Sequence, residues 1–272
     1  MKSNLVKVII PIYNDRLSEN ERISLDRTYN ILNNYPIVII KPYLLNLNFL
    51  SEKYPALAFE SFDDDYFRSL SGYNKLMLSE EFYERFADTF YVLICQLDAY
   101  IFKDELKEWC LRGYDYVGAP WLIRPIYRFS LLRFTSWIKK QYCDFFNLPN
   151  GQITNFRVGN GGFSLRKTES HLNATKQLRP IIQFYLSRKR HHIYNEDVFW
   201  AVEVNKQGLG FRYPDCMEAL QFSFDKYPKW CYKLNNYQLP FGCHSWYKRK
   251  MKKFWFPIIL NSNIKWRIIN PY

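Results

Sequence analysis

The sequence predicts an α/β protein with a Rossmann-like, doubly wound and mostly parallel central sheet flanked by helices. In the first half of the chain, short apolar segments rich in Val, Ile and Phe alternate with longer helical segments. That alternation is typical of parallel strands joined by helices. The segment Ile37–Ile40 is apolar at every position, as expected of a strand covered on both faces.

The first expected elements are a strand over Val6–Ile12 and a helix that ends near Asn33. Ser18 and Glu21 have the spacing of a capping box, which places the start of this helix. Further strands are expected at Ile37–Ile40, Ala56–Glu60, Phe90–Cys95 and Tyr114–Val117. Further helices are expected at Tyr66–Phe86, with a break near Gly72, and at Lys103–Leu111.

The alternation fails after Trp121, and residues from about 122 to 150 have the composition of a basic, aromatic and amphipathic insertion. Beyond it, a short strand is expected after Gly159–Gly162. Helices are expected over Thr168–Arg190 and from Asn195 through Asn205. The chain from Phe211 onward is aromatic and rich in predicted loops. Without repeats or a low-complexity linker, we expect one domain over 1–247 and a C-terminal extension over 248–272.

Positive charge is concentrated in the second half of the chain. Residues 1–122 hold 13 Lys and Arg against 18 Asp and Glu, whereas residues 123–272 hold 25 against 8. A surface with this excess attracts anions such as nucleic acid, phospholipid headgroups or a phosphorylated substrate. The basic and aromatic segment Trp246–Trp266 suits an anionic membrane surface, although its aromatic residues could equally complete the core.

Several classes of protein are not expected. The sequence has no apolar run of about 18 residues that could span a membrane. The six cysteines form no CxxC pair, so a zinc knuckle is not expected. The N-terminus has the pattern of a first strand rather than of a signal peptide. We therefore expect a cytoplasmic protein with reduced thiols.

Asp98 is the residue most suggestive of a site. It directly follows the apolar strand Phe90–Cys95 in the triplet Gln96-Leu97-Asp98. The carboxyl ends of parallel strands are where open α/β sheets bind ligands. A carboxylate at this place needs a cation or hydrogen-bond donors. Alternatively, it only caps the following turn.

Five segments occur in an order that resembles the GT-A nucleotide-sugar glycosyltransferases, and most closely the bacterial DUF5672 family of presumed glycosyltransferases. They are GYNKLM, QLDAYIF, GNGGFSLR, NEDVFW and GCHSW, which together with the N-terminal strand cover roughly residues 5–247. The resemblance implies a GT-A-like fold. It also implies transfer of a sugar, with UDP-sugar as the default donor, to a hydroxyl of a glycan or lipid-linked glycan in bacterial surface polysaccharide or glycoconjugate synthesis.

The resemblance also implies a divalent metal, Mn²⁺ or Mg²⁺, that neutralises the diphosphate of the donor. Asp98 would be one ligand, and His244 would be the second. Gln96 departs from the pattern, because GT-A enzymes usually carry an acid at this first position of the triplet. The metal requirement is therefore open, and His244 could instead be a hydrogen-bonded packing residue.

Glu196 and Asp197 open a predicted helix, where any acid is favoured by the helix dipole. The functional reading, supported by the resemblance, makes Asp197 the general base and Glu196 a ligand of the acceptor hydroxyl. That arrangement would invert the configuration at the anomeric carbon.

The other expected site residues surround the donor and the acceptor. Donor contacts are expected from Pro11, Tyr13, Asn14, Lys75, Gln96, Leu97, Gly161 and Gly162. The two glycines would either leave space for the donor sugar or form a tight turn. Lys75 could instead be a solvated helix residue. Trp121 is expected to stack on an acceptor sugar or to pack in the core.

Two other functions stay open at this point. The first is a non-catalytic, membrane-associated carbohydrate-binding protein with a degenerate site, which the loss of an acid at Gln96 permits. The second is a nucleic-acid-binding protein, suggested by the basic half of the chain. No nucleic-acid-binding motif is present, so a nucleic-acid partner is not expected.

Overall fold

The computed structural model describes residues 4–123, 130–146, 148–188 and 192–269. Within these residues, six strands form a central sheet in the order β3-β2-β1-β4-β9-β6. Its strands are β1 (Asn4–Pro11), β2 (Ile37–Pro42), β3 (Leu57–Phe62), β4 (Thr89–Cys95), β6 (Tyr116–Val117) and β9 (Phe163–Lys167). The first four in the sheet order run parallel, whereas β9 is antiparallel to both neighbours. The predicted fold class is confirmed.

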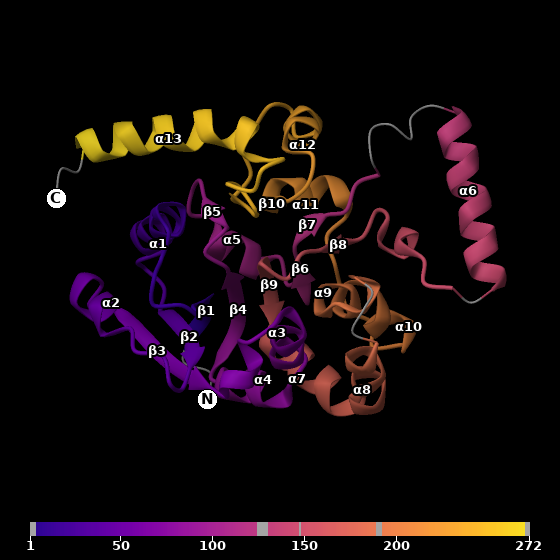
Figure 1. The fold of residues 1–272 in the computed structure, drawn as a ribbon, viewed down its shortest axis with the longest axis horizontal. Helices are drawn as coiled ribbons and strands as arrows, with labels where there is room; N and C mark the ends of the chain where they lie inside the picture. The colour runs from indigo at the N-terminus through magenta and orange to yellow at the C-terminus, as the bar shows by residue number, and fades with distance from the viewer. Residues whose placement is uncertain (1–3, 124–129, 147, 189–191, 270–272) are drawn as a thin grey trace.

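Helices cover both faces of this sheet (Figure 1). They are α1 (Glu19–Ile31), α2 (Asn48–Lys53), α3 (Leu70–Met77), α4 (Glu80–Arg85), α5 (Leu106–Leu111), α7 (Thr168–Gln177) and α8 (Arg179–Ser187). Alternate residues of β1 enter two different cores. Val8 and Ile10 pack with α1, α2 and α5, whereas Ile9 packs with α3, α4 and α7. This two-sided burial explains why the strands are apolar throughout.

The local helix signals are confirmed in one place and corrected in another. Ser18 and Glu21 form the predicted capping box at the start of α1. The single break predicted near Gly72 needs correction, because the region is interrupted both at 67–69, just before α3, and at Ser79, whose hydroxyl caps α4, while Gly72 itself lies in the first turn of α3. A Cβ on Gly72 would lie 2.2 Å from the carbonyl oxygen of Asp65. The glycine therefore permits close packing rather than a break.

From Tyr100 onward, the chain adds several short elements that the sequence pattern did not predict. A small sheet has the order β10-β11-β5, and β7 pairs with β8. Their bounds are β5 (Tyr100–Ile101), β7 (Ala119–Pro120), β8 (Val158–Gly159), β10 (Ser223–Phe224) and β11 (Gly242–Cys243). Two residues are too few to show a periodic pattern. The helices here are α6 (Ser130–Phe145), α9 (Glu196–Val198), α10 (Val204–Lys206), α11 (Cys216–Phe222), α12 (Pro228–Leu234) and α13 (Lys252–Ile269).

The described residues also form several short helical turns. They are the 3₁₀ turns η1 (Asp64–Tyr66), η3 (Gly151–Thr154) and η4 (His192–Tyr194), and the π-helical segment η5 (Phe199–Glu203). The helix expected from Asn195 through Asn205 thus consists of α9, η5 and α10 in succession. π-helical turns are frequent at functional sites, and this one directly follows the helix that carries Glu196 and Asp197.

The aromatic residues of the C-terminal segment are largely in the core. Trp246, Trp255 and Ile259 are buried in one apolar cluster. The Trp246 indole also donates a 2.8 Å hydrogen bond to the Ser24 hydroxyl on α1. These tryptophans therefore complete the fold and do not offer a surface. In the part of the chain that the structure describes, no helix is long and apolar enough to cross a membrane.

The predicted insertion contains α6, which is amphipathic as expected. Parts of the two predicted additions lie outside the described residues: 124–129 and 147 of the insertion, and 270–272 of the extension. The proposed boundary at residue 247 stays a prediction.

Candidate active site

The site lies at the carboxyl edge of β4, where Gln96-Leu97-Asp98 leads into β5. Because β9 runs antiparallel to β4, the Gly159–Gly162 segment before β9 lies at this same edge. The backbone N–H of Gln96 donates a 2.8 Å hydrogen bond to the backbone carbonyl of Gly162. Sheet direction alone thus brings together two segments that are about 60 residues apart in the sequence.

Asp98 is surrounded by cationic partners from the C-terminal part of the chain. Its Oδ1 lies 2.9 Å from His244 Nε2, and its Oδ2 lies 2.8 Å from Lys248 Nζ. The opposite imidazole nitrogen, Nδ1, lies 3.2 Å from the Asp225 carboxylate. The Trp246 amide donates to the Asp98 carbonyl at 3.2 Å. The predicted pair of Asp98 and His244 is therefore close in space, held by a backbone contact.

The charges in this cluster reinforce one another. Burial alone would raise the pKa of Asp98, but His244 and Lys248 hold it well below its usual range. Burial would lower the pKa of His244, yet Asp98 and Asp225 together raise it to about 9. These shifts favour an ionised Asp98 beside a protonated His244 at neutral pH.

The same two residues fit a divalent metal. Among the described residues, neither Asp98 Oδ1 nor His244 Nε2 has a hydrogen-bond partner of acceptable angle, despite their short separation. Both atoms are buried, and each offers a lone pair when His244 is neutral. A hard cation is commonly held by one or two protein groups together with substrate phosphates and water. In the described parts of the chain, no group of three or more His, Cys, Asp and Glu side chains could hold a metal alone, so a cation at Asp98 and His244 would need further ligands such as phosphate oxygens or water.

Two adjacent glycines separate this cluster from the acid pair. A Cβ on Gly162 would lie 2.2 Å from His244 Nε2, and one on Gly161 would lie 1.8 Å from Glu196 Oε1. Neither glycine has a positive φ, so side-chain crowding rather than backbone strain requires them. The glycine turn therefore lies between the candidate metal ligands and Glu196.

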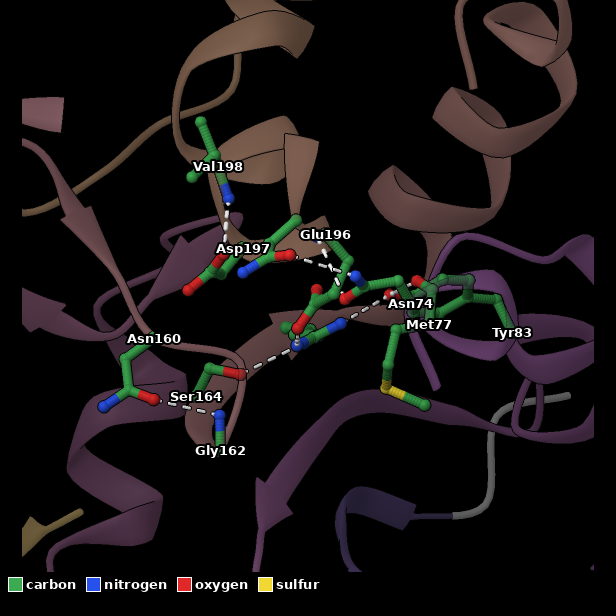
Figure 2. A network of polar contacts seen from close by, with 11 residues as sticks. Asn74, Met77, Tyr83, Asn160, Gly162, Ser164, Glu196, Asp197 and Val198 are labelled. Carbon is green, nitrogen blue, oxygen red and sulfur yellow. Dashed lines mark hydrogen bonds and ion pairs between the residues drawn. The ribbon is translucent and has the colours of Figure 1, made fainter. Parts of the chain in front are cut away.

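Glu196 forms a buried ion pair below this turn. Its Oε1 accepts a 3.0 Å bond from the buried Arg166 guanidinium, which also donates to the Tyr83 and Ser164 hydroxyls. Burial raises the pKa of Glu196, and Arg166 opposes that effect. Within the described chain, Glu196 Oε2 has no hydrogen-bond partner. Figure 2 shows this network beneath α9.

Asp197 points away from that network, toward the side on which Asn160 lies (Figure 2). It is partly exposed, and its Oδ1 accepts a 2.9 Å bond from the Val198 amide. Burial and the neighbouring Glu196 raise its pKa to about 7. A carboxylate with that pKa can accept a proton near neutral pH.

Asn74, rather than its neighbour Lys75, connects the GYNKLM segment to the acid pair. The side-chain Nδ2 of Asn74 donates a hydrogen bond to Asn195 Oδ1 at 3.2 Å. The side-chain Oδ1 of Asn74 accepts one from the backbone N–H of Glu196 at 3.3 Å. Lys75 is exposed, with Nζ 5.5 Å from the centre of the Tyr66 ring. Its predicted contact with the donor stays a prediction.

The other predicted donor and acceptor residues surround the site at different depths. Pro11 ends β1 and is buried, whereas Tyr13 is 66% exposed. Asn14 is exposed and accepts a bond from the Arg16 amide. Leu97 packs on the core below β4. The Trp121 ring covers Gly159, where an added Cβ would lie 2.1 Å from it.

The sequence did not predict four residues of this arrangement: Asn74, Arg166, Asp225 and Lys248. Arg166 did carry a signal, because a charged residue in the apolar strand FSLRK must find a buried partner. Lys248 follows His244 by four residues. This spacing predicts that Lys248 reaches the site only when His244 is already known to lie there. Nothing local distinguishes Asp225 from other loop acids.

The close contact at Gly162 makes a direct prediction. In Gly162→Ala, the new methyl group displaces His244 or Gln96, so we expect the free energy of unfolding to fall by about 1–3 kcal/mol. We also expect the affinity for Mn²⁺, measured by isothermal titration, to fall at least about tenfold. Gly208→Ala is the control, because its added Cβ meets open space and only its φ of +80° is unfavourable. It should cost about 1 kcal/mol and leave Mn²⁺ binding unchanged. Unaltered Mn²⁺ affinity in Gly162→Ala would contradict this prediction.

The comparisons with known proteins agree with this geometry. A family model described as "Protein of unknown function (DUF5672)" matches residues 56–244. The galactosyltransferase LgtC, solved with donor and acceptor sugar analogues, superposes with a TM-score of 0.51 at 12% identity, covering 94% of each chain. The apo form of the glycosyltransferase GlyE of Streptococcus pneumoniae TIGR4 has a TM-score of 0.52 at 9% identity, covering 97% of this chain and 64% of that one. No curated protein matches the sequence.

Identities this low establish the fold and leave the activity to be argued from the site. The family match spans more than half of the chain, and the fold match spans nearly all of it. The matched segment contains Asp98, the Gly159–Gly162 turn, the acid pair and His244. The chain therefore belongs to the DUF5672 family and has the GT-A fold found in glycosyltransferases.

Proposed function

We propose that this protein is a glycosyltransferase that moves a sugar from a nucleoside diphosphate donor to a hydroxyl of a glycan acceptor. A single observation supports this most strongly. A charged cluster of Asp98, His244 and Lys248 lies on one side of a glycine turn, and the acid pair of Glu196 and Asp197, the latter with a pKa of about 7, begins on the other. Sugar transfer needs both parts, because negative charge develops on the leaving diphosphate while the acceptor hydroxyl loses a proton.

The donor would bind with its diphosphate beside Asp98, His244 and Lys248. Asp98 and His244 would hold Mn²⁺ or Mg²⁺, which supplies charge neutralisation for the diphosphate when bound. Lys248 is 58% exposed along its side chain and could turn from Asp98 to a phosphate oxygen. UDP is the default nucleotide by family resemblance, with Pro11, Tyr13 and Asn14 at the edge that would receive the base.

Asp197 would act as the general base. It takes the proton of the acceptor hydroxyl while the hydroxyl oxygen forms a bond to the anomeric carbon. The bond from that carbon to the diphosphate oxygen breaks, and its electron pair leaves with the nucleotide. Direct attack of this kind inverts the anomeric configuration. Glu196 is buried and paired with Arg166, which favours a positioning role over the predicted acceptor contact.

The proposed setting is synthesis of a bacterial surface polysaccharide or glycoconjugate by a cytoplasmic enzyme. Trp121 is the proposed acceptor platform, since it lies beside Gly159 at the entrance to the same turn. Product stereochemistry tests the mechanism separately from the activity. An anomeric proton coupling in the NMR spectrum that matches the donor configuration would contradict the role of Asp197 as a base for direct attack.

Donor binding can be tested without knowing the acceptor. A thermal-shift panel of UDP and UDP-sugars with Mn²⁺ should stabilise the protein, by about 2.7 kcal/mol at 100 times the dissociation constant. Asp98→Asn should remove this ligand-dependent shift, because the amide neither binds the cation well nor attracts Lys248. Asp65→Asn is the matched control, since Asp65 is exposed and pairs with Arg68 away from the site. A full shift in Asp98→Asn would place the donor elsewhere.

A further inference from the structure

Helix α6 carries an unusual set of exposed apolar side chains. Eight large hydrophobic residues within 131–148 are at least 46% exposed: Leu131, Phe134, Trp137, Ile138, Tyr142, Phe145, Phe146 and Leu148. Figure 1 shows α6 at the periphery of the molecule, set apart from the central sheet. An exposed apolar group of this size marks an interaction site on a folded protein.

The exposed residues form a continuous face. Leu131, Phe134, Ile138, Tyr142 and Phe145 recur at intervals of three and four, which places them on one side of a helix. The more covered positions are Leu132, Ser136 and Cys143. At 3.6 residues per turn these lie on the opposite side, where the Gln152 side chain also donates to the Ser136 carbonyl. The apolar face therefore points away from the rest of the protein.

Basic residues lie beyond both edges of this face. On a helical projection at about 100° per residue, Lys139 lies beyond Tyr142 at one edge and Arg133 beyond Phe134 at the other, whereas Lys140 lies nearly opposite the centre of the face; all three are exposed. The helix sequence contains a single acid, Asp144. A second copy of this chain would bring like charges together along such a contact. An anionic lipid surface instead complements both features, because aromatic side chains enter the interface while Lys and Arg meet the headgroups.

We propose that α6 binds the surface of an anionic bilayer, lying in the interface plane with its apolar face inserted. The helix is about 24 Å long at 1.5 Å per residue, enough for several inserted side chains. This inference is independent of sugar transfer. It also relocates the expected membrane contact, because the tryptophans of the C-terminal segment at positions 246 and 255 are buried.

Flotation of the full chain with vesicles tests the proposal. The protein should float with vesicles of phosphatidylglycerol and phosphatidylcholine, and its bound fraction should fall at least about tenfold with phosphatidylcholine alone. Phe134→Ser/Ile138→Ser and Arg133→Glu/Lys139→Glu should each reduce flotation with the anionic vesicles at least about tenfold. All four side chains are exposed, so the thermal midpoint should stay close to that of the original protein.

Matched controls change the same kinds of residue elsewhere. Leu111→Ser/Phe184→Ser alters two exposed apolar residues, and Lys229→Glu/Lys233→Glu alters two exposed lysines on α12. Both controls should float normally. Failure of the unaltered protein to float, or normal flotation of both α6 variants, would overturn the proposal. So would light scattering that shows a lipid-free dimer which the α6 variants convert to monomers, because a second copy would then cover the face.

Discussion

Replacing Asp197 with asparagine should lower the rate of sugar transfer by about 10²–10⁴-fold, the usual contribution of a positioned general base. The amide keeps the shape of the side chain and the bond from the Val198 amide but cannot take a proton. Transfer by the unaltered protein should rise with pH through about 7, because the raised pKa of Asp197 leaves the base protonated below that value. Steady-state kcat/KM from pH 5.5 to 9 measures both effects.

The same variant should be more stable than the unaltered protein at alkaline pH. Asp197 has a pKa of 3.8 when solvated and about 7 in the fold. The favourable contribution of its protonated form is complete below pH 4 and is lost as the pH rises through 7. Asp197→Asn avoids this loss, and we expect it to gain on the order of 2 kcal/mol in urea unfolding at pH 8. Near pH 4 the two proteins should be about equal.

Glu84→Gln is the control for both measurements, since Glu84 is an exposed acid on α4 that pairs with Lys176. It should change neither transfer nor the pH dependence of stability. An Asp197→Asn protein with full activity would remove Asp197 from the mechanism. If the Asp197→Asn protein is less stable at pH 8 than the unaltered protein, the fold does not destabilise the Asp197 carboxylate.

The second large effect concerns Arg166, whose guanidinium is completely buried against Glu196. Arg166→Met should lower the free energy of unfolding by about 3–5 kcal/mol at pH 7.5, because it leaves a buried carboxylate without its countercharge. The loss should become smaller as the pH falls. Burial raises the pKa of Glu196, and the variant lacks the Arg166 charge that opposes this rise, so the buried carboxyl is protonated more readily and then needs no cation.

A second substitution separates the lost pair from lost packing. Arg166→Met/Glu196→Gln removes both charges, and it should recover most of the stability, since replacing a whole buried pair is often close to neutral. Urea unfolding of the two single variants and the double variant measures the coupling. Additive losses would mean that the ion pair contributes nothing specific. Recovered stability without recovered transfer would assign Glu196 to the positioning of Asp197.

The fold was predictable from the sequence where the signal is local. The strand ending at Pro11 and the capping box at Ser18 depend on neighbouring residues, and both are as expected. The error at Gly72 has the opposite origin. A glycine inside a helix looks like a break, and only the distant carbonyl of Asp65 explains why it is there.

The site was predictable only in part, for the same reason. Asp98 follows from its place after a buried strand, and the pairing with His244 followed from family resemblance rather than from any local pattern. Asp225 and Lys248 reach the cluster through tertiary structure, and their own neighbours in the sequence do not indicate it. The aromatic C-terminal segment was ambiguous between core and membrane surface, because composition does not tell which face of a tryptophan is covered.

The hydrogen bond between Trp246 and Ser24 joins residues 222 positions apart, and this has a consequence for biosynthesis. A ribosome makes the whole central sheet, with Asp98 and the glycine turn, before His244 and Lys248 emerge. Until that late segment docks on α1, Asp98 faces the site without either cation that lowers its pKa. The charged centre beside Asp98 is therefore completed only by the last part of the chain, and removing the residues after 243 would take away both of its cations together with the buried Trp246 and Trp255.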